Sequence, residues 1–162
     1  MPDPVIPTAP ERQALSDICD WAVSLAQAER APQFTAAILR GQDEIARARN
    51  EVAGTCDPSR HAEIVAIAAA AQRLGRRDLS GHTLLSSCQP CEMCLAAMRW
   101  ARIDRLIFAA RQESLGDGFF QFGALGIGDL QRASGGAFAY LGGVEEARVL
   151  RVYRPSGGGG GA

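Results

Sequence analysis

The sequence predicts an α/β protein, because short apolar runs that suit buried strands alternate with longer segments of helical spacing. Two buried-strand runs, residues 83–87 and 105–110, enclose a helical segment at residues 91–100. Another helical segment, residues 62–74, ends at Gly75, a residue that readily takes the left-handed conformation found after helices. Strands that alternate with helices imply a layered fold with some parallel pairing.

The remaining segments are expected to add one helix, one hairpin and a less regular C-terminal part. Residues 11–30 carry apolar residues at helical spacing. Residues 34–39 and 44–50 flank a turn-forming sequence and predict a hairpin, and residues 53–60 predict a loop. Residues 115–143 are crowded with glycine and predict no regular element, whereas residues 144–153 are expected to end as a strand at 149–152.

Length and composition indicate one globular domain. The chain has 162 residues, of which 47% are hydrophobic and 22% charged. We expect the domain to span residues 11–155. A flexible arm with four prolines would precede it at residues 1–10, and a flexible glycine-rich tail would follow at residues 156–162.

Charge and hydropathy exclude several classes of partner. A net charge of -1 and a pI of about 6.1 argue against an extended nucleic-acid footprint, which usually needs a basic face. No apolar run is long enough to span a bilayer, and the N-terminus lacks the pattern of a signal peptide. We therefore expect a cytoplasmic protein with no membrane association, and the charge disfavours a nucleic-acid partner.

The chemistry is concentrated in two short motifs, His61-Ala62-Glu63 and, about thirty residues later, Pro90-Cys91-Glu92-Met93-Cys94. One imidazole and two thiolates provide three ligands for Zn²⁺, which prefers four and can hold a water in the open position. Zinc lowers the pKa of such a water to about 7. Glu63 follows the histidine at a spacing that suits proton transfer rather than metal binding.

Two other interpretations of these motifs stay open at this point. Cys88 and Cys91 also form a C-x-x-C pair, so Cys88 could complete a closed structural zinc site that has no catalytic role. Glu63 could simply stabilise the dipole in the first turn of a helix.

The order H-x-E…P-C-x-x-C is the signature of zinc-dependent base deaminases. The chain resembles the bacterial nucleobase deaminases of the cytidine deaminase-like superfamily, and guanine deaminases most of all. The resemblance covers roughly residues 14–110 and rests on His61-Ala62-Glu63-Ile64, Cys88-Gln89-Pro90-Cys91-Glu92-Met93-Cys94-Leu95, Trp100-Ala101-Arg102, Pro32-Gln33-Phe34, Arg49-Asn50 and Asp57-Pro58.

This resemblance implies a three-layer α/β/α sandwich with a central five-stranded mixed sheet, a zinc cofactor and a homodimer. It also implies roles for individual residues. Glu63 would shuttle protons, and the substrate would be bound by Asn50, Phe34, Ala62 and Trp100. On residue type alone, Asn50 could equally be a turn residue, and Phe34 and Trp100 could be core residues.

One segment departs from the guanine deaminase pattern. Where that family carries a G-F-D-D-like sequence, this chain has Gly116-Asp117-Gly118-Phe119-Phe120-Gln121-Phe122, which indicates a more apolar pocket wall. A late aromatic such as Tyr153 could cap the site, although the similarity there is too weak to assign that role.

The expected function is zinc-dependent hydrolytic deamination of an amino group on a small nitrogen heterocycle. A guanine-like nucleobase or nucleoside is the first choice of substrate and a cytosine-like one the second. The alternatives are a tRNA adenosine deaminase and a structural zinc module without catalysis.

Overall fold

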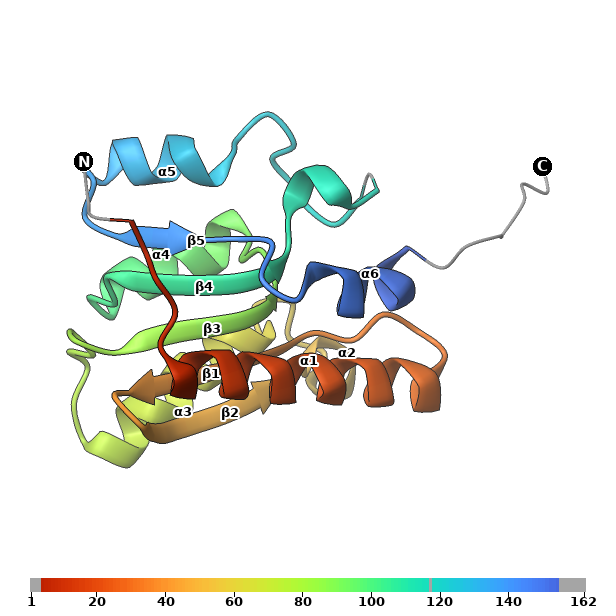
Figure 1. The fold of residues 1–162 in the computed structure, drawn as a ribbon, viewed down its shortest axis with the longest axis horizontal. Helices are drawn as coiled ribbons and strands as arrows, with labels where there is room; N and C mark the ends of the chain where they lie inside the picture. The colour runs from red at the N-terminus through yellow and green to blue at the C-terminus, as the bar shows by residue number, and fades with distance from the viewer. Residues whose placement is uncertain (1–3, 117, 155–162) are drawn as a thin grey trace.

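A computed structural model describes residues 4–116 and 118–154 of the chain, and its centre is a five-stranded mixed sheet (Figure 1). The strand order is β2-β1-β3-β4-β5. Strand β1 pairs antiparallel with β2 and with β3, while β3, β4 and β5 run parallel. The strands are β1 (Thr35–Arg40), β2 (Asp43–Arg49), β3 (Thr83–Cys88), β4 (Arg105–Ala110) and β5 (Ala139–Leu141).

Helices cover both faces of this sheet, so the expected three-layer α/β/α arrangement with a five-stranded mixed sheet is confirmed (Figure 1). Helices α1 (Ala9–Glu29) and α6 (Glu146–Tyr153) pack on one face. Helices α3 (Ala62–Leu74), α4 (Glu92–Trp100) and α5 (Ile127–Ala133) pack on the other. Two short elements, α2 (Val52–Thr55) and the 3₁₀ helix η1 (Gln112–Ser114), lie in connections. No helix among the described residues is both long and apolar enough to cross a bilayer.

Alternation along the central strands separates two cores. Because successive side chains of a strand point to opposite faces, Leu84 lies in the core beneath α3 and α4, whereas Leu85 lies in the core beneath α1. The next two residues continue this alternation with hydroxyl groups. Ser86 contacts Glu63 on α3, and Ser87 contacts Tyr153 on α6. Strand β3 therefore presents a polar group to each layer at the same end of the sheet.

The N-terminal segment is more ordered than the sequence analysis predicted. Helix α1 begins at Ala9 rather than at residue 11, because Thr8 and Glu11 form a capping box. Val5 is only 8% exposed and packs in the core beside α1. Ala9 and Pro10, which the predicted arm of residues 1–10 included, therefore belong to helix α1. Residues 1–3 and the glycine tail at 156–162 lie outside the described residues.

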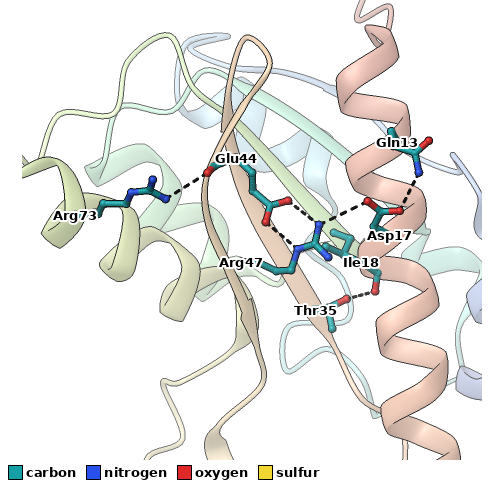
Figure 2. A network of polar contacts seen from close by, with 7 residues as sticks. All are labelled: Gln13, Asp17, Ile18, Thr35, Glu44, Arg47 and Arg73. Carbon is teal, nitrogen blue, oxygen red and sulfur yellow. Dashed lines mark hydrogen bonds and ion pairs between the residues drawn. The ribbon is translucent and has the colours of Figure 1, made fainter.

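Polar contacts bind both helical layers to the β1–β2 hairpin, as Figure 2 shows. The Thr35 hydroxyl donates a hydrogen bond of 2.6 Å to the carbonyl of Ile18 on α1. Arg47 on β2 lies 3.7 Å from the carboxylate of Asp17 on the same helix. On the opposite side, the guanidinium of Arg73 on α3 donates to backbone carbonyls of β2, the shorter bond being 2.7 Å. The hairpin is thus held from both faces of the sheet.

The C-terminal third differs most from expectation. Residues 149–152 form part of helix α6 and not the predicted strand. Val149 and Tyr153, four residues apart, are both buried, and this spacing places them on one face of a helix. The fifth strand is instead β5, within the glycine-rich stretch that predicted no element. The expected loop at residues 53–60 contains the end of the short helix α2.

Candidate zinc centre and active site

Three metal-ligand atoms meet at the carboxyl end of β3. The His61 Nδ1 atom lies 3.6 Å from each of the Cys91 and Cys94 sulfurs, and the two sulfurs are 3.6 Å apart. Tetrahedral zinc, with Zn–S of about 2.3 Å and Zn–N of about 2.0–2.1 Å, requires its ligand atoms to be about 3.5–3.8 Å apart. The triangle has these dimensions, so the residues fit zinc, and no other described residue joins the ligand cluster at the fourth tetrahedral position.

Helix starts fix these ligands. His61 is the N-cap of α3, and Cys91 is the N-cap of α4, so both lie where unpaired backbone N–H groups and the helix dipole favour anions. The two helices follow β2 and β3. These strands run in the same direction, and β1 lies between them in the sheet. Their carboxyl ends still lie at one edge of the sheet.

The protonation of the three ligands shows why a cation belongs among them. Hydrogen bonds from Cys94 and His61 lower the pKa of Cys91 to about 4. The same thiol–thiolate bond, together with burial, raises the pKa of Cys94. The Cys91 thiolate in turn raises the pKa of His61. Two sulfurs this close cannot both ionise without a compensating positive charge, and a divalent ion provides it.

Glu63 lies beside the ligands and is almost fully buried at 5% exposed. One carboxylate oxygen is 3.4 Å from the Cys94 sulfur, and the other is 2.8 Å from the Ser86 hydroxyl. Burial raises the pKa of Glu63 above its usual range, while hydrogen bonds from its own backbone N–H and from Ser86 act in the opposite direction. A buried carboxyl group with a raised pKa is suited to act as a general acid and base.

Cys88 does not complete a closed metal site. It is absent from the cluster of ligand atoms, which contains only His61, Cys91 and Cys94 among the described residues. Its side chain is buried at 6% exposed, and burial raises its thiol pKa well above the usual range. The interpretation of Cys88 as a fourth ligand is therefore not supported by the geometry.

A cavity of about 740 Å³ opens onto the ligand cluster. Glu63 lies in its lining, together with two of the predicted substrate-binding residues, Asn50 and Phe34. The side-chain oxygen of Asn50 accepts a hydrogen bond of 2.9 Å from the backbone N–H of Val52, so the residue also shapes a turn. Its amide nitrogen has no partner among the described residues and is available to a ligand.

Two predicted substrate-binding residues lie elsewhere. Trp100 is 88% exposed and lines a separate groove between the C-terminal ends of α3 and α4. Six residues after Cys94, the helix has advanced about 9 Å and rotated by about 240°, so motif spacing alone does not bring the ring back to the zinc site. Ala62 is fully buried in the core beneath α3 and is not part of the cavity lining.

Tyr153 supports the site from behind. Its ring stacks on Phe34 with centroids 5.0 Å apart, and its hydroxyl lies 2.7 Å from the Ser87 hydroxyl and 3.0 Å from the Gln33 carbonyl. The residue is 3% exposed, and burial raises its pKa well above the usual range. Tyr153 therefore positions Phe34 and does not cap the cavity of its own chain.

Sequence reasoning missed several residues of this site. Strand alternation from buried Leu84 would have pointed Ser86 toward α3, so a signal for its contact with Glu63 was present. Gln89 lines the cavity with its amide fixed by two hydrogen bonds of 3.1 Å with Gln112, and no sequence pattern predicted that pair. Asp117, which the sequence analysis compared with the acidic segment of guanine deaminases, lies outside the described residues.

Comparison with known proteins agrees with this geometry. The family described as the cytidine and deoxycytidylate deaminase zinc-binding region matches residues 10–110. The chain therefore belongs to this family of zinc-dependent deaminases, and His61, Cys91 and Cys94 form its zinc-binding group.

Relatives within the family carry different names. Guanine deaminase of Bacillus subtilis is 38% identical over 87 residues, which are 54% of this chain and 56% of that protein. The tRNA-specific adenosine deaminase of Aquifex aeolicus is 35% identical over 99 residues, 58% of this chain and 66% of that protein. A tRNA(Ile)-lysidine synthase of Deinococcus deserti is 33% identical over 145 residues, 88% of this chain but 26% of that protein. The chain thus spans about a quarter to two thirds of the length of these curated relatives.

Solved structures share the fold over most of the chain. Guanine deaminase from Nitrosomonas europaea has a TM-score of 0.75 at 23% identity, covering 93% of this chain and 85% of that one. The protein NE0047 in complex with 2,6-diaminopurine has a TM-score of 0.76 at 24% identity, covering 96% of this chain and 87% of that one. At these identities the likeness concerns the fold alone.

Proposed function

We propose that the chain catalyses hydrolytic deamination of an amino group on a small nitrogen heterocycle, with a guanine-like base or nucleoside first and a cytosine-like one second. The observation that carries the proposal is the place of Glu63. Its buried carboxyl group lies against a three-ligand zinc-binding group, within a cavity that also presents an aromatic ring and a free amide nitrogen.

The residues of the chain account for each proton that the reaction moves. Bound zinc supplies the Lewis acidity that makes a water nucleophilic at neutral pH. Glu63 takes a proton from the attacking water as its oxygen adds to the amino-bearing carbon, and it delivers that proton to the adjacent ring nitrogen. Glu63 then carries the second water proton to the amino group, which leaves as ammonia while the carbon becomes a carbonyl. Phe34 offers a face for stacking, and the amide nitrogen of Asn50 offers a donor for an edge of the base.

The relatives support a base as substrate but do not choose among bases. Guanine deaminase of Bacillus subtilis, 38% identical over 87 residues, supports a purine as the first candidate. The tRNA adenosine deaminases match at similar identity and form the second candidate. Among the described residues, the cavity lining contains no arginine and the chain contains no lysine, whereas a site for RNA should contact phosphates with basic groups. A free base or nucleoside is therefore the better candidate.

Two finer proposals follow from the resemblance to bacterial nucleobase deaminases, namely a homodimer and a cytoplasmic location. Light scattering on the eluting protein should give a mass twice the 17.2 kDa of one chain. A mass near that of one chain at all concentrations would contradict the dimer.

The experiment that tests the function measures ammonia release from a panel of guanine, cytosine, adenine, their nucleosides, pterins and triazines. Glu63→Ala should keep its zinc and its fold and lose about two to four orders of magnitude in turnover, because a positioned general acid and base is removed. Activity within a few-fold of the unaltered protein would reject the role of Glu63. Loss of zinc from this variant would show that Glu63 is a ligand.

A competition experiment separates the two candidate substrates. Turnover of a free base should continue in excess tRNA at low salt, where electrostatic binding to a polynucleotide is strongest. Deamination of a tRNA anticodon loop, with no turnover of any free base or nucleoside, would replace the first candidate by the second.

A further inference from the structure

One wall of the cavity is more apolar than the binding of a planar base requires. Beyond Phe34, the segment at residues 118–122 adds Phe119, Phe120 and Phe122 to the lining. The Phe119 ring meets Phe34 edge to face, with centroids 6.0 Å apart at 82°. Phe122 is 60% exposed, so its ring presents apolar surface that the protein itself leaves in water. Exposed apolar patches mark interaction sites or ligand-binding grooves, and these phenylalanines lie in the lining of a cavity.

The cavity also has space beyond a single ring system. Pockets of about 300–1,000 Å³ hold drug-sized ligands, and this one measures about 740 Å³. Phe34 and Asn50 line this cavity together with the zinc ligands His61 and Cys91, and the phenylalanines of residues 118–122 belong to the same lining.

The charges around the cavity disfavour a phosphate beside these phenylalanines. Apart from the zinc-binding group, the ionisable side chains in the described lining are the carboxyl groups of Glu63 and Glu92 and the buried thiol of Cys88. No arginine of the described chain lines the cavity, and the sequence contains no lysine. A phosphoryl group placed there would be desolvated beside phenyl rings without a cation or guanidinium to pair with it.

We propose that the preferred substrate is an unphosphorylated heterocycle that carries an apolar alkyl or aryl substituent, and that Phe119, Phe120 and Phe122 bind this substituent. The inference rests on the proposed deaminase function and names the substrate class of the same site. The substituent gains affinity by covering the exposed Phe122 ring and by edge or stacking contacts with the other two.

The test compares matched probes on the zinc-loaded full chain. In each of a guanine and a cytosine series, the probes are the bare base, its benzyl derivative at the nitrogen that bears the sugar in nucleosides, the nucleoside and its 5′-monophosphate. The benzyl derivative should exceed the bare base in kcat/KM by at least tenfold, since a single buried methylene is worth roughly 10–200-fold in such a pocket. The monophosphate should fall at least tenfold below its nucleoside.

Substitutions test whether the phenylalanines of residues 118–122 cause the preference for benzyl derivatives. Phe122→Ala and Phe120→Ala should each lower the ratio of benzyl to bare-base kcat/KM at least several-fold. Trp100→Ala is the matched control, because it removes an exposed ring that lies outside this cavity, and its ratio should equal that of the unaltered protein. Calorimetric titration of benzylguanine and benzylcytosine into the Glu63→Ala protein gives a second measurement that does not need turnover.

The outcomes separate the two proposals. If the bare bases are turned over but their benzyl derivatives have an equal or lower kcat/KM, the substituent proposal is overturned and the deaminase function stays intact. A monophosphate preferred over its nucleoside would have the same consequence. Failure of the zinc-loaded protein to deaminate any heterocycle, including the wider panel, overturns the proposed function itself. Tighter binding of the benzyl probes that survives both phenylalanine substitutions would also reject the phenylalanine wall as their site.

Discussion

Ser86 is expected to act as a positioning residue for Glu63, and Ser86→Ala tests this. The Ser86 hydroxyl is fully buried and lies 2.8 Å from a Glu63 carboxylate oxygen. Hydrogen bonds to charged groups contribute about 1.5–3 kcal/mol. If the contact is needed in the transition state, its loss should lower kcat/KM by about tenfold to about 150-fold.

The pH dependence separates positioning from a general loss of structure. The hydrogen bond from Ser86 lowers the pKa of Glu63 against the larger effect of burial, so its removal should raise that pKa further. Glu63 must be ionised to accept a proton from water, and activity falls as the pH drops through its pKa. The acidic limb of the pH–rate profile should therefore move to higher pH in Ser86→Ala.

The adjacent residue, Ser87, provides the control for Ser86→Ala. Ser87 is equally buried, but its hydroxyl contacts Tyr153 and accepts a bond of 3.0 Å from the Thr35 backbone N–H on the other face of the sheet. Ser87→Ala should lower the melting temperature without moving the acidic limb. The reasoning fails if Ser86→Ala keeps kcat/KM within threefold and its limb unmoved, or if both variants shift the profile alike.

Three further results are expected. Metal analysis should give about one zinc per chain, and Cys91→Ser should lose most of it while Cys88→Ser retains it; equal loss from both would make Cys88 a ligand. Burial alone would raise the pKa of Glu11, but hydrogen bonds, chiefly from Arg105, lower it to about 2 from an ordinary 4.5. Because the folded pKa is the lower one, this group stabilises the fold by about 3 kcal/mol above pH 4.5, and the contribution is lost as the pH falls from about 4.5 to 2. In urea titrations the difference between the unaltered protein and Glu11→Gln should therefore shrink by about 1.4 kcal/mol between pH 7 and 3.5, and a constant difference would contradict the assignment. Phe34→Ala should weaken substrate binding more than Tyr153→Phe does, as judged by KM, because only Phe34 lines the cavity; equal effects would mean that the hydroxyl behind the ring matters as much as the ring.

The parts of the fold that the sequence predicted well are those whose pattern permits a single interpretation. Helix α3 lies at the predicted residues because its apolar period and Gly75 agree, and β4 lies at its predicted run because it is apolar from Leu106 to Ala110. Residues 149–152 permit two interpretations, since a short apolar stretch suits a strand or a helix, and only the packing of Val149 and Tyr153 decides between them. Strand β5 is three residues long and is defined by its pairing with β4, which no local pattern encodes.

The residues of the site also divide into those that a local pattern predicts and those that only the folded structure places. His61, Glu63, Cys91 and Cys94 were predictable because their chemistry depends on fixed spacing within helix starts. Trp100 lies outside this cavity, because a motif position does not specify which way a side chain points after more than one and a half further helical turns. The polar pair of Gln89 and Gln112 arises from two loops that only the folded sheet brings together.

The ligands of the zinc-binding group come from opposite sides of β3 in the chain, with His61 thirty residues before Cys91. An ion held there joins the starts of two helices that are otherwise connected through a long stretch of backbone, so it acts as a removable crosslink of the native state. Because zinc binds the folded protein, free zinc at about 1,000 times its dissociation constant would add about 4 kcal/mol to the free energy of unfolding. The amount of intact protein in a cell would then follow the supply of zinc, even for molecules that never meet a substrate.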